Sequence, residues 1–212
     1  MFSLKSPTTS FVTTVKGVLL SPVNFFKTTS WEKVPLTDSV VFAFICYAVA
    51  QVITFLLSSL QLFNTLPQSI RGMTSAGQGI NYFLVAFIMA IVMFFINAGV
   101  VYLVIKYVFK SKSSFNATVA ALSAVAAVSL LAWIPVVNIL VGLYGLILTV
   151  IAVREMAKLT TVQAVITLVI SFIVNAILTG VLFAQIMASF YLNQFQSPGV
   201  TDLKQQIPNY TK

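Results

Sequence analysis

The sequence predicts an all-α integral membrane protein, a polytopic bundle of five transmembrane helices preceded by interfacial amphipathic helices. Of its 212 residues 59% are hydrophobic and 8% are charged, whereas soluble domains carry about 25% charged residues. Acidic and basic side chains are absent from residues 39–70, 72–105, 113–153 and 159–201. A spanning helix needs about 20 mostly apolar residues and satisfies its own backbone hydrogen bonds. These four tracts therefore hold at least four spans, and 113–153 is long enough for two.

Residues 1–36 are predicted to form a basic segment on the cytoplasmic membrane surface. Ser21-Pro22 is typical of an N-cap followed by proline at the first helical position, so we expect two short helices here. Helical periodicity in the first one predicts an apolar face and an opposite face of small or polar residues. The apolar face is Phe11, Val12, Val15, Val18 and Leu19, and the opposite face is Thr13, Thr14, Lys16 and Gly17.

Aromatic and basic side chains gather at the end of this segment. Such rings suit the head-group region of a bilayer, where ammonium groups meet lipid phosphate. The alternative is a pair of ordinary helices packed on the bundle. The candidate interfacial or partner-binding residues are Phe25, Phe26, Lys27 and Trp31.

The transmembrane domain is expected at 37–192, followed by a polar external tail at 193–212. Thr37 and Asp38 are expected to cap the first span, because small polar side chains accept hydrogen bonds at helix starts. The stretch 64–80 contains proline and three glycines and is expected to be a loop. The five spans are expected at about 38–63, 81–107, 116–134, 137–153 and 160–190.

Small residues mark two spans for close packing. The third span is rich in alanine, which lets helix backbones approach closely, so we expect it at the centre of the bundle. Pro135 separates it from the fourth span; the alternative is that 116–153 form one broken or re-entrant unit. On the fifth span Ala176, Gly180 and Ala184 form a small-xxx-small pattern. This face is expected to pack within the chain or, alternatively, to join two copies in a homo-oligomer.

Lysine and arginine are unequally divided between the two predicted sides. Nine of the 12 fall on the N-terminal side and three on the other. Short cytoplasmic loops are enriched in these residues, so the N-terminus is expected in the cytoplasm and the C-terminus outside. The same excess of basic residues favours anionic lipids as partners. The sequence has no basic recognition helix, so nucleic acid is not expected as a partner. The nine are Lys5, Lys16, Lys27, Lys33, Lys106, Lys110, Lys112, Arg154 and Lys158.

No catalytic, cofactor or metal site is predicted. The chain has no histidine and one cysteine, and its predicted spans lack the ionisable groups on which proton and ion pathways depend. Asn97, Asn175 and Gln185 are candidates for a polar cavity in the membrane; the alternative is hydrogen bonding between helices. Arg154 and Lys158 either belong to a partner-binding patch or simply end two spans.

The order of several motifs resembles the Yip family of membrane proteins. These motifs are Pro22-x-x-Phe25-Phe26 before the first span, Ile134-Pro-Val-Val137, Val153-Arg-Glu-Met156 and Gln163-Ala164 at the last span, and the resemblance covers most of 18–190. It implies five spans with a cytoplasmic N-terminus, and eukaryotic members act in Golgi and endoplasmic reticulum trafficking through GTPases or other partners. This chain lacks the Asp-Leu-Tyr-Gly-Pro motif of those members and is more similar to short prokaryotic ones. The resemblance therefore transfers no functional residue.

Three functions are consistent with these features. The first is a non-enzymatic membrane protein that organises partner proteins or the bilayer through its cytoplasmic side. The alternatives are a transporter or channel for a neutral or lipid-like solute, and an accessory subunit of a larger membrane complex. We expect the cell (inner) membrane for a prokaryotic protein and the Golgi or endoplasmic reticulum membrane for a eukaryotic one.

Overall fold

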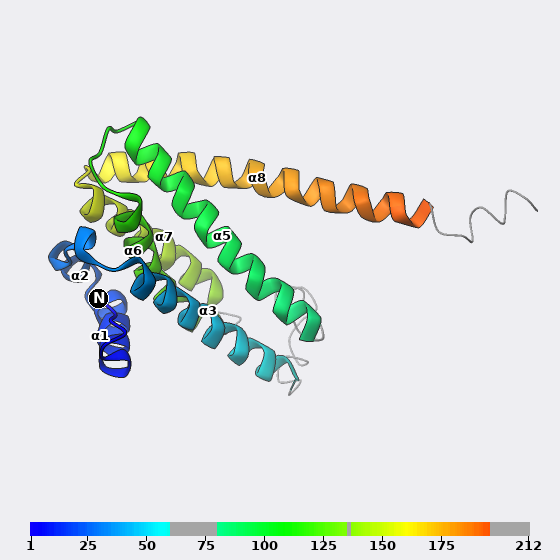
Figure 1. The fold of residues 1–212 in the computed structure, drawn as a ribbon, viewed down its shortest axis with the longest axis horizontal. Helices are drawn as coiled ribbons and strands as arrows, with labels where there is room; N and C mark the ends of the chain where they lie inside the picture. The colour runs from blue at the N-terminus through cyan, green and yellow to red at the C-terminus, as the bar shows by residue number, and fades with distance from the viewer. Residues whose placement is uncertain (60–79, 135–136, 196–212) are drawn as a thin grey trace, which may run out of the picture. The chain divides into compact units, whose positions relative to one another are not determined.

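The computed structural model describes residues 1–59, 80–134 and 137–195, and within them the chain forms seven α-helices, two 3-10 helices and no strand (Figure 1). The predicted all-α class is confirmed. The chain divides into two compact units, Met1–Ser171 and Phe172–Lys212. Residues 64–79 of the predicted loop and nearly all of the predicted tail 193–212 lie outside the described residues, and Ile80 begins a helix.

Four described helices are long and apolar enough to cross a membrane. They coincide with the first, second, fourth and fifth predicted spans. Because their side chains are mostly apolar, these helices are suited to the lipid interior of a membrane. In chain order they are α3 (Leu36–Ser59), α5 (Ile80–Tyr107), α7 (Asn138–Ala157) and α8 (Thr161–Phe195). The second unit contains the part of α8 from Phe172 onward, where apolar side chains such as Phe172 are exposed.

The predicted cap of the first span is wrong by two residues. The helix α3 begins at Leu36, so Thr37 and Asp38 lie inside its first turn. The carbonyl of Pro35 accepts hydrogen bonds from the Ser39 backbone N–H at 3.2 Å and from its hydroxyl at 3.0 Å, which starts the helix earlier. Asp38 still lies near the positive end of the helix dipole, where a carboxylate is stabilised.

The helix α7 is longer than the predicted span 137–153 and includes Arg154 and Glu155 in its last turn. The two side chains form a salt bridge of 2.6 Å, so the helix continues through both charges. The neighbours Val153, Met156 and Ala157 are buried. Because packing and pairing both favour helix here, the charges lie on the helix rather than in a loop.

The third predicted span, 116–134, is not one continuous α-helix. It consists of α6 (Phe115–Val125) and the 3-10 helix η2 (Ala126–Leu131). The hydroxyls of Ser123 and Ser129 donate to carbonyls three residues earlier, at 2.8 and 2.7 Å. Serine hydroxyls that bond nearby carbonyls compete with the regular α-helical bonds, which accounts for the tighter winding.

The prediction that this alanine-rich helix is central is confirmed. All eight residues from Ala117 to Ala124 are buried, so this part of α6 leaves no face for solvent or lipid. Figure 1 shows α6 among α3, α7 and the N-terminal helices, and it contacts α3, α5 and α7. Small side chains allow several helices to approach one another around α6.

The N-terminal segment is built into this unit rather than laid on it. Its helices are α1 (Pro7–Leu20) and α2 (Pro22–Thr28), followed by the 3-10 helix η1 (Trp31–Lys33). The hydroxyl of Tyr144 on α7 donates to the Leu19 carbonyl at 2.8 Å. Val18 and Phe26 are fully buried. The α1–α2 pair is therefore held to α7 by a long-range hydrogen bond as well as by apolar packing.

The predicted faces of α1 require correction. Thr14 is buried although it was predicted on the polar face, and Val12 is half exposed although it was predicted on the apolar face. The stripe that packs inward follows the partly buried Phe11 and the buried Thr14 and Val18, at the three- and four-residue spacing of a helix. Gly17 also faces the protein, because a Cβ there would lie 2.6 Å from the Phe25 ring. Its missing side chain lets α2 pack closely on α1.

Thr14→Val is expected to raise the stability of the protein. The Thr14 hydroxyl is buried and has no hydrogen-bond partner among the described residues, and an unsatisfied buried polar group costs about 1–3 kcal/mol. Valine keeps the shape and removes the hydroxyl, so we expect a gain of about 1 kcal/mol. Thermal melting in detergent measures it, with exposed Thr8→Val as the matched control. A decrease for Thr14→Val would show that the hydroxyl has a partner.

Candidate interaction face at the basic end of the bundle

Three segments far apart in the sequence meet at one end of the first unit. They are η1, the connection 108–114 between α5 and α6, and the turn 158–160 between α7 and α8. We call this region the basic end, because eight lysines on it, on the adjoining helices and on the segment before α1 are exposed. They are Lys5, Lys16, Lys27, Lys33, Lys106, Lys110, Lys112 and Lys158.

Glu32 joins the N-terminal segment to the start of the central helix. The Ser114 backbone N–H donates to Glu32 Oε1 at 3.0 Å, and its hydroxyl donates to Oε2 at 2.5 Å. Ser114 is the N-cap of α6, and its Oγ accepts a bond from the Ala117 N–H at 3.1 Å. A carboxylate here also suits the positive end of the α6 dipole. This contact spans 82 residues of sequence, so no local pattern could have predicted it.

The same connection closes the end of α7. The hydroxyls of Ser111 and Ser113 donate to the carbonyls of Ala157 and Met156, both at 3.1 Å. The last carbonyls of a helix lack partners within the helix, so these serines satisfy two of them. The start of α6 and the end of α7 consequently lie side by side, and the two helices form a hairpin.

The turn from α7 to α8 is ordered by its own polar side chains. Lys158 adopts the left-handed conformation with φ 54°, and the Leu159 N–H bonds the Arg154 carbonyl at 3.0 Å. Gln163 accepts a bond from the Thr160 N–H at 3.0 Å, while the Thr160 hydroxyl accepts one from the Gln163 N–H at 3.3 Å. This is a capping box, a sequence signature of the form Thr-x-x-Gln that could have been recognised in advance.

The predicted patch residues Arg154 and Lys158 differ in their surroundings. Arg154 binds the Glu155 carboxylate through two nitrogens, at 2.6 and 2.9 Å, and its third nitrogen donates to the Thr161 hydroxyl at 3.3 Å. Lys158 is exposed. The geometry is consistent with an ordered helix end, and a partner-binding role for these residues stays a prediction.

The aromatic residues of the N-terminal segment lie mostly inside the protein. Phe26 is fully buried, Trp31 is 5% exposed, and their rings stack with centroids 5.4 Å apart. The Trp31 indole N–H donates to the Phe26 carbonyl at 3.0 Å. These two rings are buried in the protein and cannot insert into lipid. For them the second predicted alternative, helices packed on the bundle, is the correct one. Phe25 is partly exposed and packs edge-on against both rings, while Lys27 is exposed.

The structure leaves the predicted polar path through the membrane untested. Asn97 on α5 and Asn175 on α8 are both half-buried, and neither is without an interaction partner. Gln185 lies in α8, but its side chain is outside the described part of the structure. The two asparagines belong to different compact units. A solute path along these residues therefore stays a prediction.

Glu32→Ala is expected to loosen the start of the central helix. The change removes both acceptors of Ser114, and hydrogen bonds to charged groups contribute about 1.5–3 kcal/mol, less when exposed. We expect hydrogen exchange at residues 115–118 to become about tenfold faster, a difference of about 1.4 kcal/mol. Exchange mass spectrometry measures it, and Lys112→Ala on the neighbouring loop should leave the rate unchanged. Equal protection in Glu32→Ala would mean that the contact is unimportant.

Long apolar helices around a buried central helix, with a basic polar end, define an integral membrane protein of the multi-span helical class. The model of the Yip1 domain matches residues 16–183. The chain therefore belongs to the Yip1 domain family, and the predicted resemblance is confirmed. Neither a curated protein nor a solved structure matches the chain.

Proposed function

We propose that the protein is a non-enzymatic, five-span membrane protein that organises partner proteins or the bilayer through its basic end. The observation that carries this proposal is the construction of that end. Three distant segments are locked together by Glu32, Ser111 and Ser113, and the surface that they form carries exposed lysines. A rigid, charged surface beside a membrane suits recognition, because lysines attract anionic lipids and acidic protein surfaces.

The hairpin of α6 and α7 supports five spans rather than four. The two serine contacts place the end of α7 beside the start of α6, so α6 with η2 runs back along α7. Eleven α-helical and six 3-10 residues extend about 28 Å at their usual rises. That length is close to the roughly 30 Å hydrocarbon core. If α7 crosses the bilayer, its antiparallel neighbour crosses with it.

The excess of basic residues supports a cytoplasmic basic end. With five spans, nine of the 12 lysines and arginines fall on the side of the N-terminus, as cytoplasmic segments require. The C-terminal tail would then lie outside. The same arrangement places the exposed lysines next to the anionic lipids of the cytoplasmic leaflet.

A charge-reversal experiment tests the proposed function. Lys27 lies on α2 and Lys112 on the α5–α6 connection, and both are exposed. The double variant Lys27→Glu/Lys112→Glu is expected to lower recovery of crosslinked partner proteins from native membranes about tenfold, because attraction becomes repulsion. Lys204→Glu/Lys212→Glu, on the tail, is the matched control.

Two readouts make this experiment decisive. Membrane insertion and the melting temperature of both double variants should equal those of the unchanged chain, since surface substitutions cost little. Partner recovery should fall with the first pair alone. Equal recovery with both pairs, or no crosslinked partner with the unchanged chain, would reject the basic end as an interaction face.

A further inference from the structure

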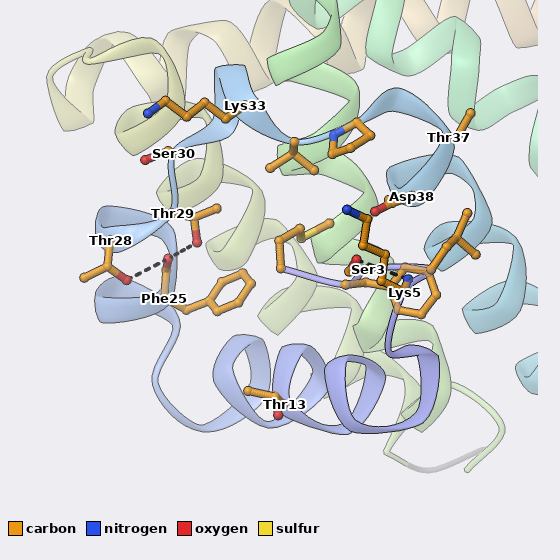
Figure 2. Close-up of a pocket in the computed structure, with 15 residues that line it drawn as sticks. Ser3, Lys5, Thr13, Phe25, Thr28, Thr29, Ser30, Lys33, Thr37 and Asp38 are labelled. Carbon is orange, nitrogen blue, oxygen red and sulfur yellow. Dashed lines mark hydrogen bonds between the residues drawn. The ribbon is translucent and has the colours of Figure 1, made fainter.

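The N-terminal segment and the start of α3 line an open cavity of about 850 Å³ at the basic end. Figure 2 shows its wall, which includes Lys5, Lys33 and Asp38. Sites for small molecules usually have volumes of about 300–1,000 Å³, so this cavity is large enough for a molecule the size of a lipid head group. It lies where the first membrane span begins.

Asp38 is the unusual member of this wall. It is 92% buried, being 8% exposed, and its carboxylate has no salt bridge or hydrogen bond with any described residue. The carboxylate opens onto the cavity without a salt-bridge partner, and an ammonium group bound there would give it one. In Figure 2 the Lys5 side chain reaches toward Asp38, and Lys33 lies on another side beside Ser30.

Most threonine hydroxyls of the wall are already used as donors. Those of Thr13, Thr28 and Thr29 donate to carbonyls of their own helices at 2.8, 2.8 and 2.7 Å. They cannot also donate to an anion, because a hydroxyl has one proton. The cationic side chains of the wall are those of Lys5 and Lys33, and both residues are exposed.

The buried residue Phe2 lines both the cavity and an apolar groove of about 290 Å³. Its wall comes from α1 and from Ile45 on the first membrane span, with Val12 49% exposed. The combination of a charged cavity and an apolar groove at the edge of a span fits a molecule with a polar head and a hydrocarbon chain. A bilayer supplies such molecules as its own lipids.

We propose that this site binds one aminophospholipid. Asp38 binds the primary ammonium of the head group, Lys5 and Lys33 bind the phosphate, and an acyl chain lies in the groove along Phe2 and Ile45. The two cationic side chains and one anionic side chain match a head group that has both charges. A carboxylate favours a primary ammonium over a trimethylated one, because the former donates hydrogen bonds.

Native mass spectrometry of the delipidated full chain tests this site with three lipids of equal chain length. We expect phosphatidylethanolamine to be retained about tenfold more tightly than phosphatidylcholine or phosphatidylglycerol. Soluble glycerophosphoethanolamine should compete at least about a hundredfold more weakly, since it cannot fill the groove. Equal retention of the three lipids would overturn the proposal without any variant. Equally tight binding of the soluble head group would overturn a lipid as the occupant.

Variants assign the two charges separately. Asp38→Asn should remove the preference for phosphatidylethanolamine over phosphatidylglycerol. The double variant Lys5→Gln/Lys33→Gln should weaken the binding of all three lipids by about tenfold. Lys204→Gln, in the polar C-terminal stretch, is the control and should change nothing. Retained selectivity in Asp38→Asn would overturn the role of Asp38. The charge reversal at Lys27 and Lys112 is tested by recovery of partner proteins and not by lipid retention, so each proposal can fail alone.

Discussion

Replacing Ala121 by leucine is expected to destabilise the protein by about 3 kcal/mol or more. Ala121 is fully buried in the middle of α6, and helices pack around that segment. Three additional carbon atoms have no free volume there, and overpacking a dense core costs about 1–3 kcal/mol, occasionally more. The helices around α6 would have to separate. Thermal unfolding in detergent, followed by size-exclusion chromatography, measures the loss.

Gly142→Leu provides the control for this prediction. It adds a side chain to α7 at a position where a Cβ meets nothing within 4 Å. We expect unchanged or slightly higher stability, because leucine is a better helix former than glycine. A melting temperature of Ala121→Leu equal to that of the unchanged chain would contradict the central position of α6.

Phe26→Ala is expected to cost about 3–5 kcal/mol and to release the N-terminal segment from the bundle. The ring is fully buried and stacks on Trp31, so its removal leaves a cavity as well as losing apolar burial. Limited trypsin digestion at Lys27 and Lys33 should become much faster, because cleavage follows the population of the opened segment. Melting temperature gives the stability loss independently.

A second phenylalanine separates local packing from a general loss of hydrophobicity. Phe172 on α8 is 71% exposed, so Phe172→Ala removes the same ring from a site with little burial. It should leave digestion at Lys27 and Lys33 unchanged. If Phe26→Ala also left it unchanged, the N-terminal segment would not depend on Phe26 for docking.

Composition and charge distribution were sufficient to predict the class of fold. The tracts without charged residues predicted the positions of four helices that can span a membrane. This was possible because a long apolar helix is encoded by consecutive residues of the sequence. Alanine content predicted the central place of α6 for the same reason. The faces of α1 were harder, since Thr14 and Gly17 are polar or small by type but pack inward. Their environment comes from α2 and the rest of the bundle, which periodicity does not describe.

The details of the basic end depend on contacts between distant residues. Glu32 and Ser114 meet across 82 positions, and Ser113 reaches Met156 across 43. A single sequence contains no signal for such pairs, whereas the Thr160 to Gln163 capping box is local and readable. The burial of Phe26 and Trp31 also follows from tertiary packing. Taken alone, the aromatic and basic residues around Phe26 and Trp31 in the sequence are equally consistent with a location at the membrane surface.

Cysteine labelling from each side of the membrane tests five spans and a cytoplasmic basic end most directly. In a Cys46→Ser background, single cysteines replace Lys112, Asn138 or Lys158, all exposed in the structure. A membrane-impermeant maleimide should label Asn138→Cys from outside intact cells, and the other two in inverted vesicles alone. That result places the two ends of the α6–α7 hairpin on opposite sides, with the basic end inside. Labelling of Asn138→Cys and Lys112→Cys from the same side would contradict it.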